Sequence, residues 1–252
     1  MFDSLYWNEE RMNMDINSDM GELKTLLADG TYEKLMNHVT SINIACGGHA
    51  GDPEMMGAML TLAKDKGVHI GAHPSYPDKE NFGREEMKDI DPNELLDSIR
   101  DQIEALVDVA SEYEMELTHV KPHGALYNFA VNNEEVSQTI AEAIIDVDSS
   151  YKAVGLAGSK MLTVFDALGL DTISEGYVDR VYEADGTLRS RKFDDALITD
   201  PQKAANQMKE MLNGNIITVD GSSVPINITS VCVHSDTPNA VDIAQAVKEQ
   251  IQ

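Results

Sequence analysis

Four of the seven histidines follow short apolar runs and precede small or turn-forming residues: His49, His73, His123 and His234. Short apolar runs bounded by turn residues are typical of buried strands. In an α/β protein with parallel strands, the groups just beyond the carboxyl ends of the strands meet at one mouth. We therefore expect imidazoles from distant parts of the chain to converge there, where they could serve as acids, bases or metal ligands.

The first predicted strand carries polar side chains at alternate positions. In the run Asp15-Ile16-Asn17-Ser18-Asp19, alternation places Asp15, Asn17 and Asp19 on one face. Carboxylates that point into an apolar sheet are costly unless they are paired, hydrogen-bonded or bound to a cation. The pattern predicts a site at the barrel interior or mouth. The alternative is a solvent-exposed edge strand followed by a turn.

Lys121 and His49 are the strongest single candidates for functional residues. Lys121 lies between Val120 and Pro122 at a strand end, so we expect it to find an anion or to lose its proton and act as a base. The alternative is a surface lysine with its stem on apolar surface. His49 is flanked by glycines, which suits a ligand or metal site as well as a buried structural histidine. His69 and His119 are interpreted as structural.

Several charged residues have both a functional and a structural interpretation. Arg180 and Arg191 could hold an anionic substrate, but Asp179 could equally pair with Arg180. Asp52 precedes Pro53, so its role could be limited to capping a helix, and the role of Asp236, after His234, could be limited in the same way. These residues remain candidates with the alternatives open.

The order of predicted elements indicates an α/β barrel. Strand-like runs recur near residues 13–18, 42–46, 68–72, 117–121, 152–157, 171–175 and 230–234, with helix-like segments in most gaps. Asp52-Pro53, Asp91-Pro92 and Asp200-Pro201 are helix-start signals. Seven strands without a linker favour a single (β/α) barrel domain over residues 13–252 rather than a doubly wound open sheet, with residues 1–12 as an N-terminal extension.

Two stretches interrupt this rhythm. Residues 75–92 contain Pro77 and the run Asn81-Phe82-Gly83, which predicts a long loop over one face. Residues 176–199 and 214–228 contain Asp185-Gly186 and Asp220-Gly221, which predict an inserted β-hairpin or small sheet.

Composition narrows the class of protein. The formal charge of −25, from 44 acidic and 19 basic residues, argues against nucleic acid or an anionic membrane as a partner. Cys46 and Cys232 lie in apolar runs and are expected to be reduced thiols. The sequence has no signal-like amino terminus and no run of ~20 apolar residues, so we expect a soluble cytoplasmic protein. A homo-oligomer is possible.

The common catalytic signatures do not occur in this sequence. There is no HExxH, no CxxC pair, no GxSxG and no phosphate loop ending in GK[ST]. The missing phosphate loop argues against nucleotide chemistry by this chain alone in the common way.

Six blocks in order make the chain resemble the LamB/YcsF family. They are DINSDMGE from Asp15, SINIACGGHAGDPEMM from Ser41, IGAHPSYPDKENFGR from Ile70, HVKPHGALYN from His119, VDRVYEADGTLRSR from Val178 and CVHSDTPNAV from Cys232. The resemblance implies a seven-stranded (β/α) barrel of the glycoside hydrolase/deacetylase-like type. It also implies the A subunit of an ATP-dependent 5-oxoprolinase, which opens the lactam of 5-oxo-L-proline to L-glutamate together with subunits B and C.

The resemblance and the residue patterns together give a set of expected roles. The expected catalytic residues are Asp15, Asp19, His49, His73, Lys121, His123 and Asp179. The expected substrate-binding residues are Asn17, Glu22, Asp52, Tyr127, Arg180, Arg191, His234 and Asp236. A divalent metal, if bound, is expected on Asp19, His49 and His123, and ATP would be used with the partner subunits.

The chain departs from the family pattern at three places, and other functions stay open. Gly48 stands where an aromatic residue is common, Ser235 replaces a glycine, and Gly176-Tyr177-Val178 replaces an apolar-Phe-Ala run. These changes bear on pocket shape more than on reaction class. The alternatives are a stand-alone metal-dependent deacetylase or amidohydrolase acting on a sugar or small amide, and a non-catalytic subunit that binds a lactam.

Overall fold

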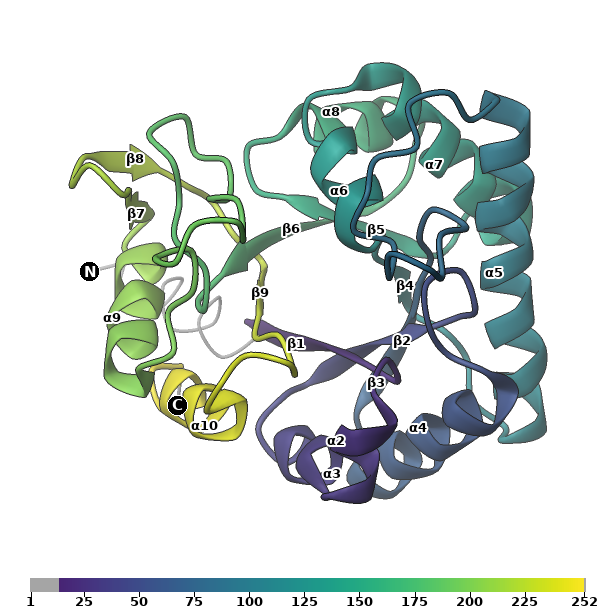
Figure 1. The fold of residues 1–252 in the computed structure, drawn as a ribbon, viewed down its shortest axis with the longest axis horizontal. Coiled ribbons are helices and arrows are strands. Elements are labelled where there is room, and N and C mark those ends of the chain that lie inside the picture. Colours follow the sequence, from purple (N-terminus) through teal and green to yellow (C-terminus); the bar gives the residue numbers. More distant parts are fainter. Residues whose placement is uncertain (1–13, 252) are drawn as a thin grey trace, which may run out of the picture.

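Seven parallel strands close into a barrel, as predicted. The structure, a computed structural model, describes residues 14–251. The strands follow the order β1-β2-β3-β4-β5-β6-β9 around the barrel (Figure 1). Their bounds are β1 Asp15–Met20, β2 Ser41–Ala45, β3 His69–His73, β4 His119–Val120, β5 Lys152–Leu156, β6 Thr172–Tyr177 and β9 Ser230–Cys232. The predicted N-terminal extension, residues 1–12, lies outside the described residues.

Helices surround the ring of strands (Figure 1). They are α2 Lys24–Ala28, α3 Thr31–Met36, α4 Pro53–Lys66, α5 Pro92–Glu112, α6 Gly124–Ala130, α7 Glu134–Asp148, α8 Lys160–Ala167, α9 Pro201–Leu212 and α10 Ala240–Lys248. The three Asp-Pro starts are confirmed: the carboxylates of Asp52, Asp91 and Asp200 each accept a backbone N–H in the first turn of α4, α5 and α9. Each cap satisfies amides that the helix itself leaves without partners.

The two faces of β1 separate an apolar core from a polar barrel interior. Ile16 and Met20 are fully buried in the hydrophobic core. Asn17, on the other face, donates to Glu175 of β6 at 2.8 Å and accepts from Asn43 of β2 at 2.9 Å inside the barrel. The alternation of side chains along a strand produces this division. The hydrogen bonds offset the cost of burying polar groups.

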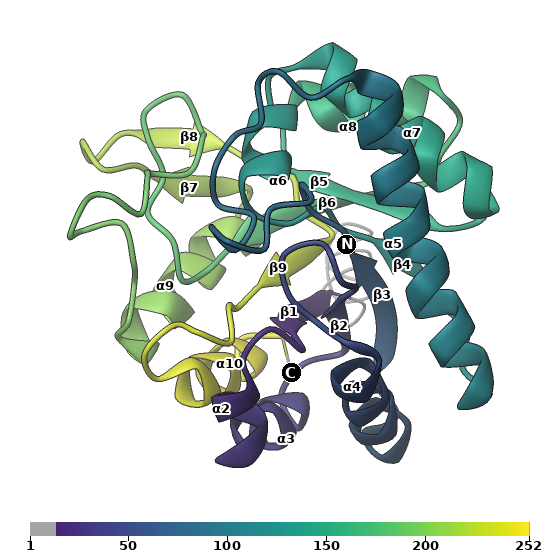
Figure 2. The ribbon, with the colours of Figure 1, turned by 45° about the vertical axis from the view of Figure 1, so that its right-hand side comes forward.

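Two predicted irregular regions are confirmed. Residues 75–91 contain no helix or strand and connect β3 to α5. The hairpin of β7 Asn215–Ile217 and β8 Ser223–Pro225 is antiparallel, and Figure 2 shows it beside the barrel near α9. Isolated bridges join Arg180 to Leu197 and Tyr182 to Leu188, so the segment after β6 folds into a further compact loop. Among residues 14–251, no helix has the length and apolar character needed to cross a membrane.

Candidate active site at the mouth of the barrel

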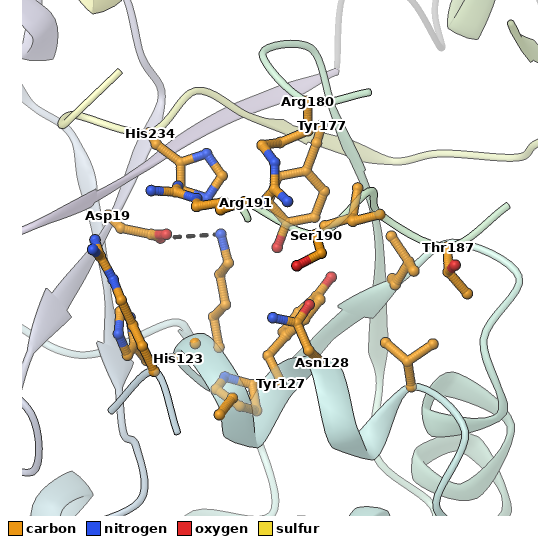
Figure 3. Close-up of a pocket in the computed structure, with 18 of the residues that line it drawn as sticks. Asp19, His123, Tyr127, Asn128, Tyr177, Arg180, Thr187, Ser190, Arg191 and His234 are labelled. Carbon is orange, nitrogen blue, oxygen red and sulfur yellow. Dashed lines mark hydrogen bonds and ion pairs between the residues drawn. The ribbon is translucent and has the colours of Figure 1, made fainter. Parts of the chain in front are cut away.

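A cavity of about 660 Å³ opens at the carboxyl ends of the strands. Residues from β1, β3 and β6, from α6 and from the segments that follow β4, β6 and β9 line it (Figure 3). The lining includes Asp19, Glu22, His73, Arg84, Lys121, His123, Tyr127, Asn128, Tyr177, Arg180, Arg191, His234 and Asp236. Most of the predicted site residues therefore meet in one place, which is where parallel barrels usually hold their active sites.

Lys121 is buried between two carboxylates at the floor of this cavity. Its Nζ atom lies 3.0 Å from Asp19 Oδ1 and 2.8 Å from Glu175 Oε1. Figure 3 draws the contact with Asp19 as a dashed line. The prediction that this lysine finds an anion is correct, and the anions belong to the chain itself. Sequence reasoning missed Glu175. This residue lies in a predicted strand, but its partner Lys121 follows a different strand, so no local pattern shows the pairing.

The charges of this group are fixed by their mutual contacts. Burial alone would lower the pKa of Lys121, but Asp19, the nearby Cys232 and Glu175 raise it well above its usual value. Burial alone would raise the pKa of Asp19, and His73, Lys121 and His234 lower it well below its usual value. These contacts favour the charged form of Lys121, which supports its interpretation as the partner of an anion over its interpretation as a base.

Three histidines gather around Glu22. Glu22 Oε1 lies 3.0 Å from His49 Nε2 and 3.2 Å from His123 Nδ1. His73 Nε2 lies 3.8 Å from the same oxygen and 3.5 Å from Asp19 Oδ2. The rings of His49 and His123 stack with centroids 3.6 Å apart. The convergence of imidazoles predicted from the strand ends is confirmed for these three.

Burial sets the charge of this histidine cluster. It lowers the pKa of His73 to about 3 and that of His49 below its usual value. Burial alone would raise the pKa of Glu22, but its contacts with His123 and His49 lower it well below the usual range. At neutral pH, Glu22 is therefore ionised, and the His73 and His49 rings are neutral.

The loop before α5 covers the histidine cluster. The carbonyl oxygen of Phe82 accepts from His123 Nε2 at 3.0 Å. Gly83 has a φ of +62°, and a Cβ atom there would lie 3.0 Å from both His123 and His49. The predicted passage of this loop over one face is confirmed, and glycine is the residue that allows the close approach.

Asp179 and His234 form a second pair on the far side of the cavity. Asp179 is fully buried and accepts from the backbone N–H of His234 at 2.9 Å and from the Thr237 hydroxyl at 2.7 Å. The His234 Nδ1 atom lies 2.9 Å from the same carboxylate. Asp179 therefore pairs with His234, and the predicted alternative of an Asp179–Arg180 pair is not observed.

Three arginines extend the cavity outward. Arg84 and Arg191 both lie 3.0 Å from Asp236 Oδ2. Arg180 is 6% exposed and donates to the carbonyl oxygen of Arg189. Within residues 14–251 it has no carboxylate within 4.0 Å, and its Nε atom has no partner. Asp236 is an arginine partner at the cavity rather than a helix cap.

The structure corrects three positions. Asp15 accepts from Ser41 at 2.9 Å and from Ser230 at the amino-terminal end of the barrel, away from the mouth, because alternation fixes the face of a strand but not the depth along it. Asn17 is enclosed in the barrel interior and does not line the cavity. Asp52 caps α4 and pairs with Lys24, so its structural interpretation is the observed one.

The expected metal-ligand set also changes. The carboxylate that lies with His49 and His123 is Glu22, which is just beyond the strand that carries Asp19. A second group of potential ligands joins Asp19 to Cys232 and His234. Asp19 accepts a hydrogen bond from Lys121, so it belongs with the Lys121 ion pair rather than with the stacked histidines.

The three unusual positions each have a local setting in the structure. Gly48 lies directly against the side chains of Gln102 and Ser75, so these residues occupy the space of any larger side chain there. The Ser235 hydroxyl donates to the carbonyl oxygen of Asp19 at 2.6 Å and joins the segment after β9 to the end of β1. Tyr177 stacks on His234 with ring centroids 5.3 Å apart and forms part of the cavity wall.

The fold and cavity define a seven-stranded parallel (β/α) barrel protein with a site rich in ionisable side chains at the carboxyl ends of its strands. Buried carboxylates and imidazoles with shifted pKa values are typical of sites for acid–base or metal-assisted chemistry. The chain belongs to the LamB/YcsF family, whose sequence model matches residues 14–252.

Known proteins are similar to this chain in sequence, in fold or in both. A protein of Halalkalibacterium halodurans, named as the A subunit of 5-oxoprolinase, is 40% identical over 95% of this chain and 93% of its own length. The crystal structure of a lactam utilization protein from Thermus thermophilus is 36% identical, covers 94% of this chain and 95% of that chain, and has a TM-score of 0.86. A putative cellobiose-phosphate cleavage protein from Enterococcus faecalis is 15% identical, covers 94% and 92% of the two chains, and shares the fold with a TM-score of 0.56.

Proposed function

We propose that the chain is the A subunit of a 5-oxoprolinase and opens the lactam of 5-oxo-L-proline to L-glutamate. The observation that carries this proposal is the match at 40% identity over nearly the whole length of a protein with that name. In the reaction, the oxygen of water bonds to the lactam carbonyl carbon, the ring C–N bond breaks, and the nitrogen takes up protons to become the glutamate amine.

We further propose that ATP hydrolysis drives the reaction together with subunits B and C. Phosphorylating the lactam oxygen would make the amide carbon a better electrophile, and water would release phosphate and glutamate. The sequence has no phosphate loop of the common type, which supports activation largely on the partner subunits. Cys46 and Cys232 are both buried free thiols, which supports a cytoplasmic location.

The proposed roles follow from the charge state of each group. Asp19 and Glu22 are ionised carboxylates at the cavity floor and can accept a proton from an attacking water. His123 lies beside Glu22 and can pass that proton toward the ring nitrogen. The Asp179–His234 pair is a second proton carrier, because the carboxylate orients the ring through Nδ1. Lys121 acts by keeping Asp19 ionised.

Arg180 is the proposed anchor for the substrate carboxylate or for a phosphate. Arg84 and Arg191 already share Asp236, whereas no described carboxylate pairs with Arg180. A buried guanidinium without a carboxylate favours binding of an anion from outside. Tyr127 donates to Glu175 at 2.9 Å and is proposed to shape the pocket wall rather than to contact the reacting atoms.

The proposal is tested by measuring ADP and glutamate release from 5-oxoproline with and without candidate B and C subunits. We expect turnover only when all three subunits and ATP are present, and loss of ring opening in His123→Ala and Asp19→Ala. Hydrolysis of acetylated sugars by the chain alone, with no stimulation by the partners, would overturn the proposal in favour of a metal-dependent deacetylase.

A further inference from the structure

Two imidazole nitrogens, one from His73 and one from His123, face each other at the cavity floor. The His73 Nδ1 atom lies 2.7 Å from the carbonyl oxygen of Lys121, and the His123 Nε2 atom lies 3.0 Å from that of Phe82. A carbonyl oxygen only accepts, so each of these nitrogens carries its ring's hydrogen. In neutral rings, the remaining nitrogens, His73 Nε2 and His123 Nδ1, are both lone-pair acceptors, yet they are 3.1 Å apart.

Further acceptors face the same point. Glu22 Oε1 lies 3.2 Å from His123 Nδ1 and 3.8 Å from His73 Nε2. Asp19 Oδ2 lies 3.5 Å from His73 Nε2. Buried acceptors that face one another without a donor repel, so a proton or a metal cation is needed between them. Lys121, the nearby cation, donates instead to Asp19, Asn17 and Cys232 and pairs with Glu175.

The spacing of the three atoms matches the edges of a metal coordination shell. With zinc–ligand distances of about 2.0–2.2 Å, neighbouring ligand atoms lie roughly 2.8–3.6 Å apart, and more widely spaced pairs up to about 4 Å. The separations of 3.1, 3.2 and 3.8 Å fall in that range. Two histidines and one glutamate, with the remaining positions open to a cavity, are a ligand set found in catalytic zinc sites.

The neighbouring contacts are those expected around such ligands. A metal-binding histidine usually donates its other N–H to a carbonyl or carboxylate, which fixes the tautomer. Lys121 and Phe82 provide these carbonyl oxygens. His49 Nε2, 3.0 Å from Glu22 Oε1, can donate to that oxygen and orient it.

We propose that Glu22 Oε1, His73 Nε2 and His123 Nδ1 bind one divalent transition-metal ion of the zinc class. This ligand set replaces the sequence-based expectation of Asp19, His49 and His123. When bound, the ion would polarise an oxygen of the substrate or of water. His49 is a positioning residue for Glu22. With Glu22 and His123 on the ion, the proton-transfer roles proposed for these two residues fall to Asp19 and to the Asp179–His234 pair. The inference deepens the proposed function, but the metal content is measured independently of any reaction.

The full-length chain, purified without a metal-chelating tag and stripped with a chelator, is titrated with Zn²⁺ by calorimetry and with Co²⁺ by visible absorption. We expect one ion per chain and a metal-dependent rise in Tm, because binding to the native state stabilises it. Glu22→Gln, His73→Asn and His123→Asn should lower the affinity for Zn²⁺ by at least about 100-fold. His49→Asn should lower it by about 10–100-fold, the range found for groups that orient ligands.

Two matched variants decide the location. His69→Asn replaces an exposed histidine at the start of β3, and His234→Asn removes a member of the second potential ligand group. Both should bind Zn²⁺ as the wild type does. Less than about one ion per ten chains in the wild type would overturn the proposal and would favour a shared proton between the two rings. Loss of binding in His234→Asn with full binding in Glu22→Gln would also overturn it. Circular dichroism of each variant identifies any that fail to fold. If one ligand variant fails to fold, the Co²⁺ spectra of the other ligand variants test whether the proposed residues bind the ion.

Discussion

Lys121 on the loop directly after β4 and Glu175 on β6 form an ion pair of 2.8 Å inside the barrel, with side chains that are 1% and 0% exposed. The same ammonium group holds Asp19 of β1 at 3.0 Å. One cation therefore joins carboxylates from two other strands. A buried charge without its partner is costly. The packing of these strands therefore depends on the charges of Lys121, Asp19 and Glu175.

Lys121→Met should destabilise the protein by about 3–5 kcal/mol, because it leaves two buried carboxylates without their cation. The free energy of unfolding in urea measures this change. Lys88→Met, which removes an exposed lysine 3.7 Å from Glu86, should change it by less than about 1 kcal/mol. In a double-mutant cycle, Lys121→Met with Glu175→Gln should cost less than the sum of the single changes. Strict additivity would refute the coupling.

Stability should fall on the acid side of pH 6.5 through His119. This ring is buried in the barrel, with its Nε2 atom 2.7 Å from Asn43 and its Nδ1 atom 2.8 Å from Thr118. Burial lowers its pKa to about 4, with smaller effects of opposite sign from Asp15 and Asp19 and of the same sign from Lys121 and His69. Because the native pKa lies below the unfolded value of 6.5, the contribution is complete above pH 6.5 and is lost as the pH falls toward 4.

The slope of unfolding free energy against pH tests this assignment. Between about pH 6 and pH 4.5, His119 should contribute up to about 1.4 kcal/mol per pH unit, which is the value for one proton. His119→Gln should reduce the slope by that amount, and His69→Asn, at an exposed position, should change it much less, because His69 supplies only a small part of the shift in the pKa of His119. Equal slopes in wild type and His119→Gln would contradict a neutral buried imidazole.

The sequence predicts the parts of this site that depend on local pattern. The strand ends, the Asp-Pro helix starts and the loop over residues 75–92 are visible because proline, aspartate and apolar runs act within a few neighbouring residues. A buried lysine must pair with an anion, so the sequence predicts that Lys121 contacts a carboxylate or another anion. Its partner Glu175 is not predicted, because the pairing depends on how β4 and β6 align across the barrel.

The error at Asp15 has a simple geometric cause. Asp15 and Asp19 share one face of β1, and a strand rises about 3.3 Å per residue, which separates them by roughly 13 Å along the strand. Periodicity reports the face and not the depth. The same limit explains why Asn17 is inside the barrel, whereas Glu22, beyond the strand end, reaches the histidines at the cavity.

Asp19→Asn and Asp15→Asn should separate catalysis from stability. Asp19→Asn should lower kcat by about 10²–10⁴-fold in the reconstituted three-subunit reaction, because it removes a proposed proton acceptor. Asp15→Asn should keep kcat within about threefold but lose about 1–3 kcal/mol of unfolding free energy, since Thr40, Ser41 and Ser230 would each donate to a weaker acceptor. Glutamate release and urea unfolding are measured on both variants. A matching loss of kcat in Asp15→Asn would place the chemistry elsewhere.

Gly83→Ala should impair the site through the histidines beneath it. The new Cβ atom would lie 3.0 Å from His123 and from His49, closer than carbon atoms pack comfortably, so the loop or the rings must move. We expect at least a tenfold fall in kcat/KM. Gly169→Ala is the matched control, because Gly169 also has a positive φ, +87°, but nothing lies within 4 Å of its Cβ position. Both variants carry the backbone cost of about 1 kcal/mol for a left-handed residue. Only Gly83→Ala should lose activity, and similar kcat/KM values in the two variants would show that the loop does not position the histidines.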